Sequence, residues 1–100
     1  MKSVIVVCEA GITTALMVTK LKELAEENKE DLNIYSKGTE EGLDYVKNVE
    51  TDVVLLGPQI HHKTEAYEEV TDAEVLKIPV NDYNNMNVYS IFEQLQKAIS

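Results

Sequence analysis

Hydrophobic residues along the chain alternate between short continuous runs and segments with helical spacing. The continuous runs are residues 3–7 (SVIVV), 32–36 (LNIYS), 52–57 (DVVLLG) and 74–79 (EVLKIP). Runs of this length and β-branched composition are typical of strands covered on both faces, as in a parallel sheet. They predict four strands, the last of which stops at Pro79 because proline cannot donate a hydrogen bond inside a sheet.

The segments between these runs carry apolar residues at steps of three and four. A first helix is expected from Thr13 to the polar stretch at residues 26–31, with these apolar positions: Met17, Val18, Leu21, Leu24 and Ala25. A weaker pattern, interrupted by Gly42, predicts a helix over residues 39–48 with Thr39 as its cap. A short helix over 63–70 and an amphipathic helix over 88–99 complete the pattern.

Four strands that alternate with four helices imply right-handed parallel crossovers. We therefore expect an α/β fold, an open four-stranded parallel sheet with helices on both faces, in the chain order βαβαβαβα and the strand order 2-1-3-4. One hundred residues suffice for one core and not for two, and no repeat or linker interrupts the pattern. Residues 1–100 are thus predicted to form one domain, which we expect to be monomeric.

The charge of the chain restricts its partners. Nine basic and eighteen acidic residues give a net charge of -9, which opposes binding to nucleic acid and to anionic membranes. The longest apolar run, residues 4–7, is far shorter than the roughly 20 residues that cross a bilayer. We expect a cytoplasmic protein with no direct membrane insertion and no signal peptide.

The only cysteine, Cys8, directly follows the first predicted strand. A single cysteine forms neither an intramolecular disulfide nor a cysteine-cluster metal site, which leaves packing, redox sensing or nucleophilic chemistry. In open parallel sheets, ligands bind beyond the carboxyl ends of the strands, which is where Cys8 is expected.

The segment after Cys8, residues 9–15 (EAGITTA), combines small side chains with two hydroxyls and leads into the first helix. Exposed backbone amides there, together with the positive end of the helix dipole, would bind a phosphate dianion and favour the thiolate form of a nearby cysteine. The alternative is structural: Cys8 fills space in the core, Gly11 makes a turn and Thr13 caps the helix. The small-residue turn favours the chemical interpretation.

Other phosphate-binding motifs do not fit this segment. It has neither the lysine of a Walker loop nor the three glycines of a dinucleotide fingerprint. A Cys-x5-Arg phosphatase loop would place arginine at position 14, where this chain has Thr14. Since that arginine normally clamps the phosphate oxygens, the loop is suited to holding a phosphoryl group and poorly equipped for phosphatase turnover.

Residues 4–27 (VIVVCEAGITTALMVTKLKELAEE) and 52–60 (DVVLLGPQI) resemble the IIB component of the lactose/cellobiose/chitobiose class of the bacterial sugar phosphotransferase system. The resemblance covers essentially the whole chain. It implies that Cys8 takes a phosphoryl group from a phosphohistidine on a IIA component and passes it to a sugar bound by the membrane-embedded IIC component. It also implies a cytoplasmic location at the transporter, with no metal and no organic cofactor.

The same resemblance implies the residues around the phosphoryl group. The phosphate-binding loop and helix start would be Glu9, Ala10, Gly11, Ile12, Thr13, Thr14 and Ala15, and the neighbouring loop would be Gly57, Pro58 and Gln59. Glu9 departs from the family, which often has a small or polar residue there. Because its charge would oppose a phosphothiolate, we expect its side chain to face solvent or a partner.

Two other functions stay open from the residues alone. One is a cysteine-dependent phosphatase or arsenate-reductase-like enzyme, which shares the fold but would lack the arginine and a resolving cysteine. The other is a noncatalytic α/β module with a buried Cys8.

Two further features follow the third and fourth predicted strands. His61 and His62 could pair with phosphate or relay a proton, although we favour two exposed residues at a helix start. Adjacent histidines point in different directions on a helix, which argues against a metal site. Tyr83 belongs to a predicted loop, residues 81–87 (NDYNNMN), that lies near the site and could touch a partner.

Overall fold

The sheet contains four parallel strands in the order β2-β1-β3-β4, as predicted. The computed structural model describes residues 2–8 and 11–99, and the side chains of all of these except residues 11–13. The strands are β1 (Lys2–Val7), β2 (Leu32–Lys37), β3 (Val53–Leu56) and β4 (Glu74–Lys77). The predicted α/β fold class is confirmed.

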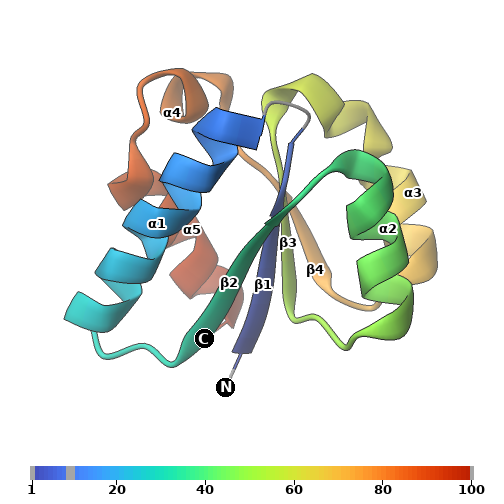
Figure 1. The fold of residues 1–100 in the computed structure, drawn as a ribbon, viewed down its shortest axis with the longest axis horizontal. Helices are drawn as coiled ribbons and strands as arrows, with labels where there is room; N and C mark the ends of the chain where they lie inside the picture. The colour runs from blue at the N-terminus through green and yellow to red at the C-terminus, as the bar shows by residue number, and fades with distance from the viewer. Residues whose placement is uncertain (1, 9–10, 100) are drawn as a thin grey trace.

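Helices cover both faces of this sheet, which Figure 1 shows nearly edge-on. On one side lie α1 (Gly11–Glu27), α4 (Val80–Asn84) and α5 (Val88–Ile99), and on the other lie α2 (Thr39–Asn48) and α3 (Thr64–Val70). A 3-10 helix, η1 (Pro58–Lys63), connects β3 to α3. Among the described residues, no helix is both long and apolar enough to cross a bilayer.

Two sequence-based predictions about where helices start were wrong. The first helix begins at Gly11 and not at Thr13, and the cap of α2 is Gly38 and not Thr39. The Gly38 amide donates instead to the Glu41 carboxylate, at 3.4 Å, so a side chain from inside the helix satisfies the cap.

The predicted loop at residues 81–87 was also wrong, because its first half lies in helix α4. Pro79 precedes this helix with a φ of -58°, and its carbonyl accepts a hydrogen bond from the Tyr83 amide at 3.0 Å. The Tyr83 side chain is buried. Burial of this ring offsets the turn preference of the neighbouring asparagines, a long-range effect that local propensity omits.

Successive residues of β1 contribute to two separate cores. Val4, Val6 and Cys8 pack with residues of α1 and α5, whereas Ile5 and Val7 pack with residues of α2 and α3. All five side chains are buried, because β1 is the central strand with helices above and below it. The position of Cys8 is therefore fixed by the alternation along the strand.

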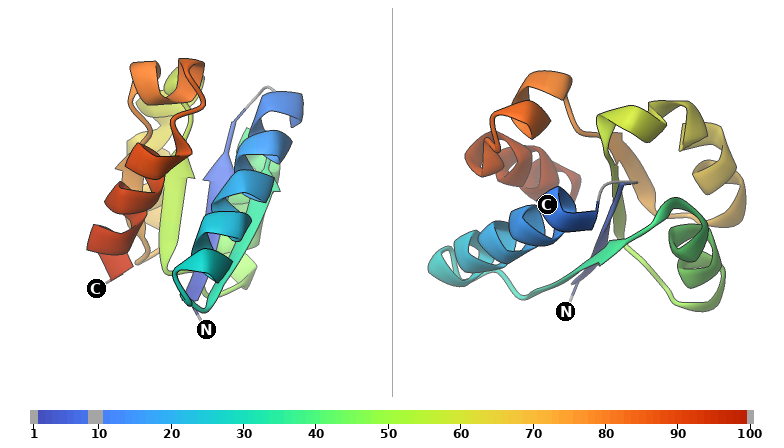
Figure 2. Two further views of the ribbon diagram at one scale, coloured as in Figure 1. Left: turned by 90° about the vertical axis from the view of Figure 1, so that its left-hand side faces the viewer. Right: turned by 45° about the horizontal axis from the view of Figure 1, so that its top comes forward.

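Because all four strands run in one direction, their carboxyl ends share one end of the sheet. The start of α1, η1 and α4 also lie at this end, at the top of Figure 1 and in the left view of Figure 2. Both marked chain ends lie at the opposite end of the sheet.

Gly42 lies in the middle of α2, where glycine is a poor helix former, and packing explains it. The fully buried Tyr67 of α3 donates a hydrogen bond from its hydroxyl to the Thr39 carbonyl at 2.7 Å. Burial, helped by the charge of Glu40, raises the pKa of Tyr67 to about 12, so this hydroxyl stays protonated. A Cβ at position 42 would collide with the Tyr67 hydroxyl oxygen and crowd Val7.

We therefore expect Gly42→Ala to destabilise the protein although alanine favours helix. Overpacking costs about 1–3 kcal/mol, and the gain in helix propensity is about 1 kcal/mol, so the net loss is up to about 2 kcal/mol in urea unfolding. In a Tyr67→Phe background the colliding oxygen is absent, and the same substitution should cost about 1 kcal/mol less. A Gly42→Ala protein more stable than the parent would contradict this explanation.

Candidate functional site

Cys8 directly extends the central strand at its carboxyl end. Its amide donates to the carbonyl of Lys37, the last residue of β2, at 3.2 Å. The backbone at Cys8 is thus held as firmly as the strand before it. Its side chain is only 3% exposed and points to the side of the sheet that α1 and α5 cover.

The end of β3 brings Gly57 against the sulfur. The Gly57 amide donates to the Val7 carbonyl at 2.8 Å, which continues the pairing of β1 with β3 by one residue. A Cβ at Gly57 would lie 3.0 Å from Cys8 Sγ, closer than side-chain carbons normally approach. Here glycine is needed for its size, since its φ of -64° is open to any residue.

Two polar side chains reach the sulfur from other elements. Cys8 Sγ donates to Gln59 Oε1 of η1 at 3.5 Å, and the Tyr83 hydroxyl of α4 lies 3.0 Å from Sγ. A cysteine that only fills space needs apolar neighbours and no hydrogen-bonding partners. The sulfur of Cys8 lies in the buried apolar core and also contacts these two polar groups, which a cysteine that only fills space would not need.

The predicted phosphate-binding segment is described only in part. Glu9 and Ala10 lie outside the described residues, and the side chains of Gly11, Ile12 and Thr13 do as well. The backbone of Gly11 begins α1 three positions after Cys8, so the amino end of a 17-residue helix follows the thiol closely. Thr14 is buried in the first turn, and Ala15 is exposed.

In the neighbouring loop, Pro58 is the first residue of η1, between the two residues that contact Cys8. The two histidines farther along η1 differ in their surroundings. His61 is partly buried, and its Nε2 lies 2.9 Å from the Ile78 carbonyl, whereas His62 is exposed. The expectation of two exposed histidines was therefore wrong for His61. This contact ties η1 to the segment that leads into α4.

Sequence reasoning placed Tyr83 near the site, as a possible contact with a partner, but missed its contact with the Cys8 sulfur. The available signal was its place after the fourth strand, since the carboxyl ends of parallel strands meet at one end of a sheet. The sequence did not predict helix α4, which turns the Tyr83 ring inward toward Cys8.

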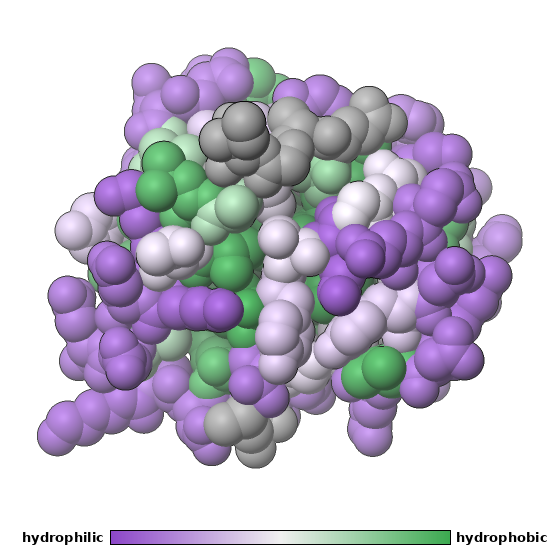
Figure 3. All heavy atoms as spheres, in the orientation of Figure 1, coloured by the Kyte–Doolittle hydropathy of each residue, from purple (hydrophilic) through white to green (hydrophobic). Residues whose placement is uncertain are grey.

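The types of charged and metal-binding residues limit the chemistry that this site can perform. All nine basic residues of the sequence are lysines, so the chain supplies no arginine to clamp phosphate. In the described ranges, no group of three or more histidine, cysteine or carboxylate side chains is placed to hold a metal ion. Figure 3 shows hydrophilic side chains along both flanks of the face seen there.

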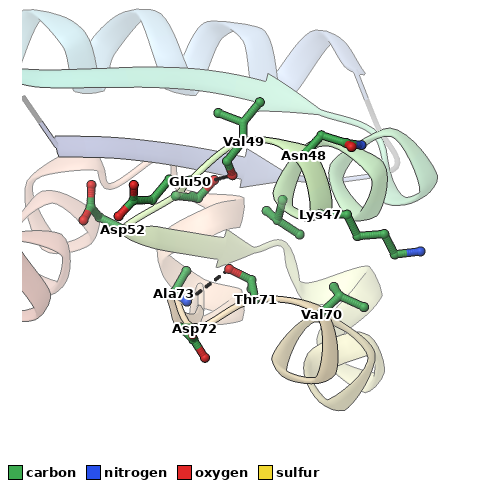
Figure 4. Close-up of a pocket in the computed structure, with 11 residues that line it drawn as sticks. Lys47, Asn48, Val49, Glu50, Asp52, Val70, Thr71, Asp72 and Ala73 are labelled. Atoms are coloured by element: carbon green, nitrogen blue, oxygen red, sulfur yellow. Dashed lines mark hydrogen bonds between the residues drawn. The ribbon is translucent and has the colours of Figure 1, made fainter.

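A hollow of about 520 Å³ lies at the other end of the sheet, far from Cys8. It is formed where the chain enters β3 and β4, and Figure 4 shows Glu50, Asp52 and Asp72 around it. These carboxylates disfavour an anionic ligand. The contacts of Cys8, and not the size of a cavity, therefore define the candidate site.

Comparison with known proteins identifies the family. A family model described as "PTS system, Lactose/Cellobiose specific IIB subunit" matches residues 3–94. The chain belongs to this family. Membership makes this IIB subunit a phosphotransferase and phosphoryl carrier of a sugar phosphotransferase system, as the sequence resemblance implied.

Individual relatives agree with the family. The chain is 29% identical over 82 residues to the oligo-beta-mannoside-specific EIIB component of Bacillus subtilis (strain 168), which is 82% of this chain and 78% of that protein. It is 32% identical over 83 residues to the galactose-specific EIIB component of Lactococcus lactis subsp. cremoris. The cellobiose-specific EIIB component of Lactococcus lactis subsp. lactis is 31% identical over 83 residues. Each of these two alignments covers 80% of this chain and 75% of the relative.

The contact between Gly57 and Cys8 yields a prediction for this IIB subunit. Gly57→Ala should displace the sulfur, shift the Cys8 13Cβ resonance and lower the free energy of unfolding by about 1–3 kcal/mol. Gly38→Ala is the matched control, because a Cβ at Gly38 has no atom within 4 Å. That control should leave the Cys8 resonance in place. An unchanged Cys8 resonance in Gly57→Ala would show that the close approach has no effect on the sulfur.

Proposed function

We propose that Cys8 carries the phosphoryl group, which it accepts from a phosphohistidine on a IIA component and passes to a sugar bound by a IIC component. The observation that carries this proposal is the place of the chain's single cysteine, at the carboxyl end of the central strand and three positions before α1 begins. No other side chain of the chain combines a thiol nucleophile with a neighbouring helix amino end. Phosphoryl transfer asks for a positioned nucleophile and stabilised oxygens, and little further covalent chemistry.

The binding of the phosphoryl group is assigned to backbone amides and the dipole of α1. In this proposal the segment from Glu9 to Ala15 encloses the phosphoryl oxygens, with Gly57, Pro58 and Gln59 beside it. Support comes from the amino end of α1, since the backbone amides and the dipole at the start of a helix favour an anion. No metal or organic cofactor enters the proposal.

The transfer step balances without a further reactant. The sulfur of Cys8 attacks phosphorus in line, the S–P bond forms, and the N–P bond of the donor phosphohistidine breaks. The thiol proton ends on the imidazole that leaves. In the second step the sugar hydroxyl oxygen attacks the same phosphorus, the O–P bond forms and the S–P bond breaks, and the hydroxyl proton goes to the sulfur of Cys8.

The setting of this function is also proposed. Residues 1–100 act as one phosphoryl-carrier domain, as a monomer in the cytoplasm, at the membrane through its IIC partner and without inserting into the bilayer or binding nucleic acid. The three relatives are named for three different sugars at similar identity, 29–32%, so no single sugar is favoured. Choice of the sugar is therefore assigned to the IIC component.

Mass spectrometry of the labelled protein tests this assignment. Mixed with a phosphorylated IIA component, the wild type should gain one phosphoryl group, on Cys8, and none on His61 or His62. Cys8→Ser should fold and stay unlabelled, because a hydroxyl without a neighbouring base is a far weaker nucleophile. Phosphate on a histidine would refute the assignment. Rapid release of inorganic phosphate without a sugar acceptor would favour a phosphatase instead.

Gly11 provides a test of the phosphate-binding segment. Gly11→Val should slow phosphorylation of Cys8 more than Gly11→Ala does, because a branched side chain at the start of α1 hinders the approach of the phosphoryl group to the amides. We expect about a ten-fold or greater difference in single-turnover rate, since losing one hydrogen bond to a charged group costs about 1.5–3 kcal/mol. Equal rates for the two variants would remove these amides from the mechanism.

A further inference from the structure

We propose that Tyr83 is a second catalytic residue, whose hydroxyl donates a hydrogen bond to the Cys8 sulfur before transfer and to a phosphoryl oxygen after it. This proposal rests on the function proposed for Cys8. It assigns to this chain a donor for the reacting atoms that comes from α4, far in sequence from the segment after β1.

The direction of the hydrogen bond follows from counting protons. The Tyr83 hydroxyl oxygen lies 3.0 Å from Cys8 Sγ, and Gln59 Oε1 lies 3.5 Å from the same sulfur. A thiol has one proton, and a carbonyl oxygen such as Gln59 Oε1 only accepts. We therefore assign the thiol proton to the contact with Gln59, and the Tyr83 hydroxyl as the donor in the shorter contact with the sulfur.

Loss of the thiol proton makes Tyr83 more important and Gln59 less so. A thiolate can no longer donate to Gln59 Oε1, which then faces a negative charge with its own negative dipole end. The Tyr83 hydroxyl still donates, and its bond becomes charge-assisted. Cys8 is 3% and Tyr83 6% exposed, so solvent screens this interaction little.

The same hydroxyl has a use after transfer. Once the S–P bond has formed, the sulfur is a poor acceptor and the charge lies on the phosphoryl oxygens, one bond beyond the phosphorus. Rotation of the hydroxyl moves its hydrogen bond from sulfur to oxygen. The hydroxyl proton stays on Tyr83 throughout, so the balance of the step is unchanged.

The elements around α4 hold Tyr83 in place. The Tyr83 amide donates to the Pro79 carbonyl at 3.0 Å, and His61 contacts the carbonyl of Ile78, the preceding residue. On the other side, the Ser90 hydroxyl of α5 donates to the Asp82 carboxylate at 2.8 Å. A donor fixed before the reaction stabilises developing charge without the cost of reorganisation.

The experiment compares Tyr83→Phe with Tyr67→Phe, which removes a buried hydroxyl on the opposite face of the sheet. With a phosphorylated IIA component as donor, Tyr83→Phe should lower kcat about ten- to hundred-fold, the value of a hydrogen bond to a charged group. KM should not change, because the buried Tyr83 ring offers almost no surface to the donor protein. The 31P resonance of phosphorylated Cys8 should shift. Tyr67→Phe should keep the kcat and the 31P shift of the wild type.

A measurement on the wild type covers the case in which Tyr83→Phe does not fold. The 13Cζ resonance of Tyr83 should move when Cys8 is phosphorylated, and that of Tyr67 should not. An unmoved Tyr83 resonance overturns the proposal. So does a folded Tyr83→Phe protein with wild-type kcat and 31P shift, while Cys8 keeps its proposed role. A wild type that is not labelled on Cys8 refutes the proposed function itself, and the role of Tyr83 with it.

Discussion

The parallel pairing of β1 with a strand on each side is the constraint on which the candidate site depends. Neighbours β2 and β3 satisfy the backbone of β1, and helices on both faces bury its side chains. The pairing extends past the strand itself, through the Cys8 amide to Lys37 and the Gly57 amide to Val7. Because these hydrogen bonds fix the backbone at Cys8, the position of its thiol is fixed as well, and other elements can place side chains against it. Gln59 of η1, which follows β3, and Tyr83 of α4, which follows β4, are the partners that reach it.

Two glycines show how tightly the elements around β1 approach one another. Gly57 leaves room for the Cys8 sulfur on one face, and Gly42 leaves room for the Tyr67 hydroxyl on the other. Neither contact involves a backbone conformation that only glycine adopts. In both places a polar atom occupies the space that a side chain would need.

The strands and their order follow from the sequence because four continuous apolar runs, separated by helical spacing, leave few alternative topologies. Only the part of the site that lies next to a predicted strand in the sequence could be predicted. Cys8 and its loop stood next to a strand end, whereas Tyr83 lies 75 positions away and depends on α4. That short helix contains Asn81, Asp82 and Asn84, which by themselves favour turns. Gly42 likewise predicted only a weak helix, because the reason for a glycine there is the Tyr67 hydroxyl, which comes from a residue 25 positions later.

The two marked chain ends lie on the side of the protein away from Cys8, which affects how this carrier could be fused to another domain. Both ends lie at the amino end of the sheet, and Cys8 lies at the carboxyl end, the full length of β1 away. The six residues of β1, at about 3.3 Å each, place Lys2 about 20 Å from Cys8. A tether fused to either end would leave the carboxyl end of the sheet, where Cys8 lies, pointing away from the tether and open to successive partners. An attachment of this kind would orient the carrier without obstructing it.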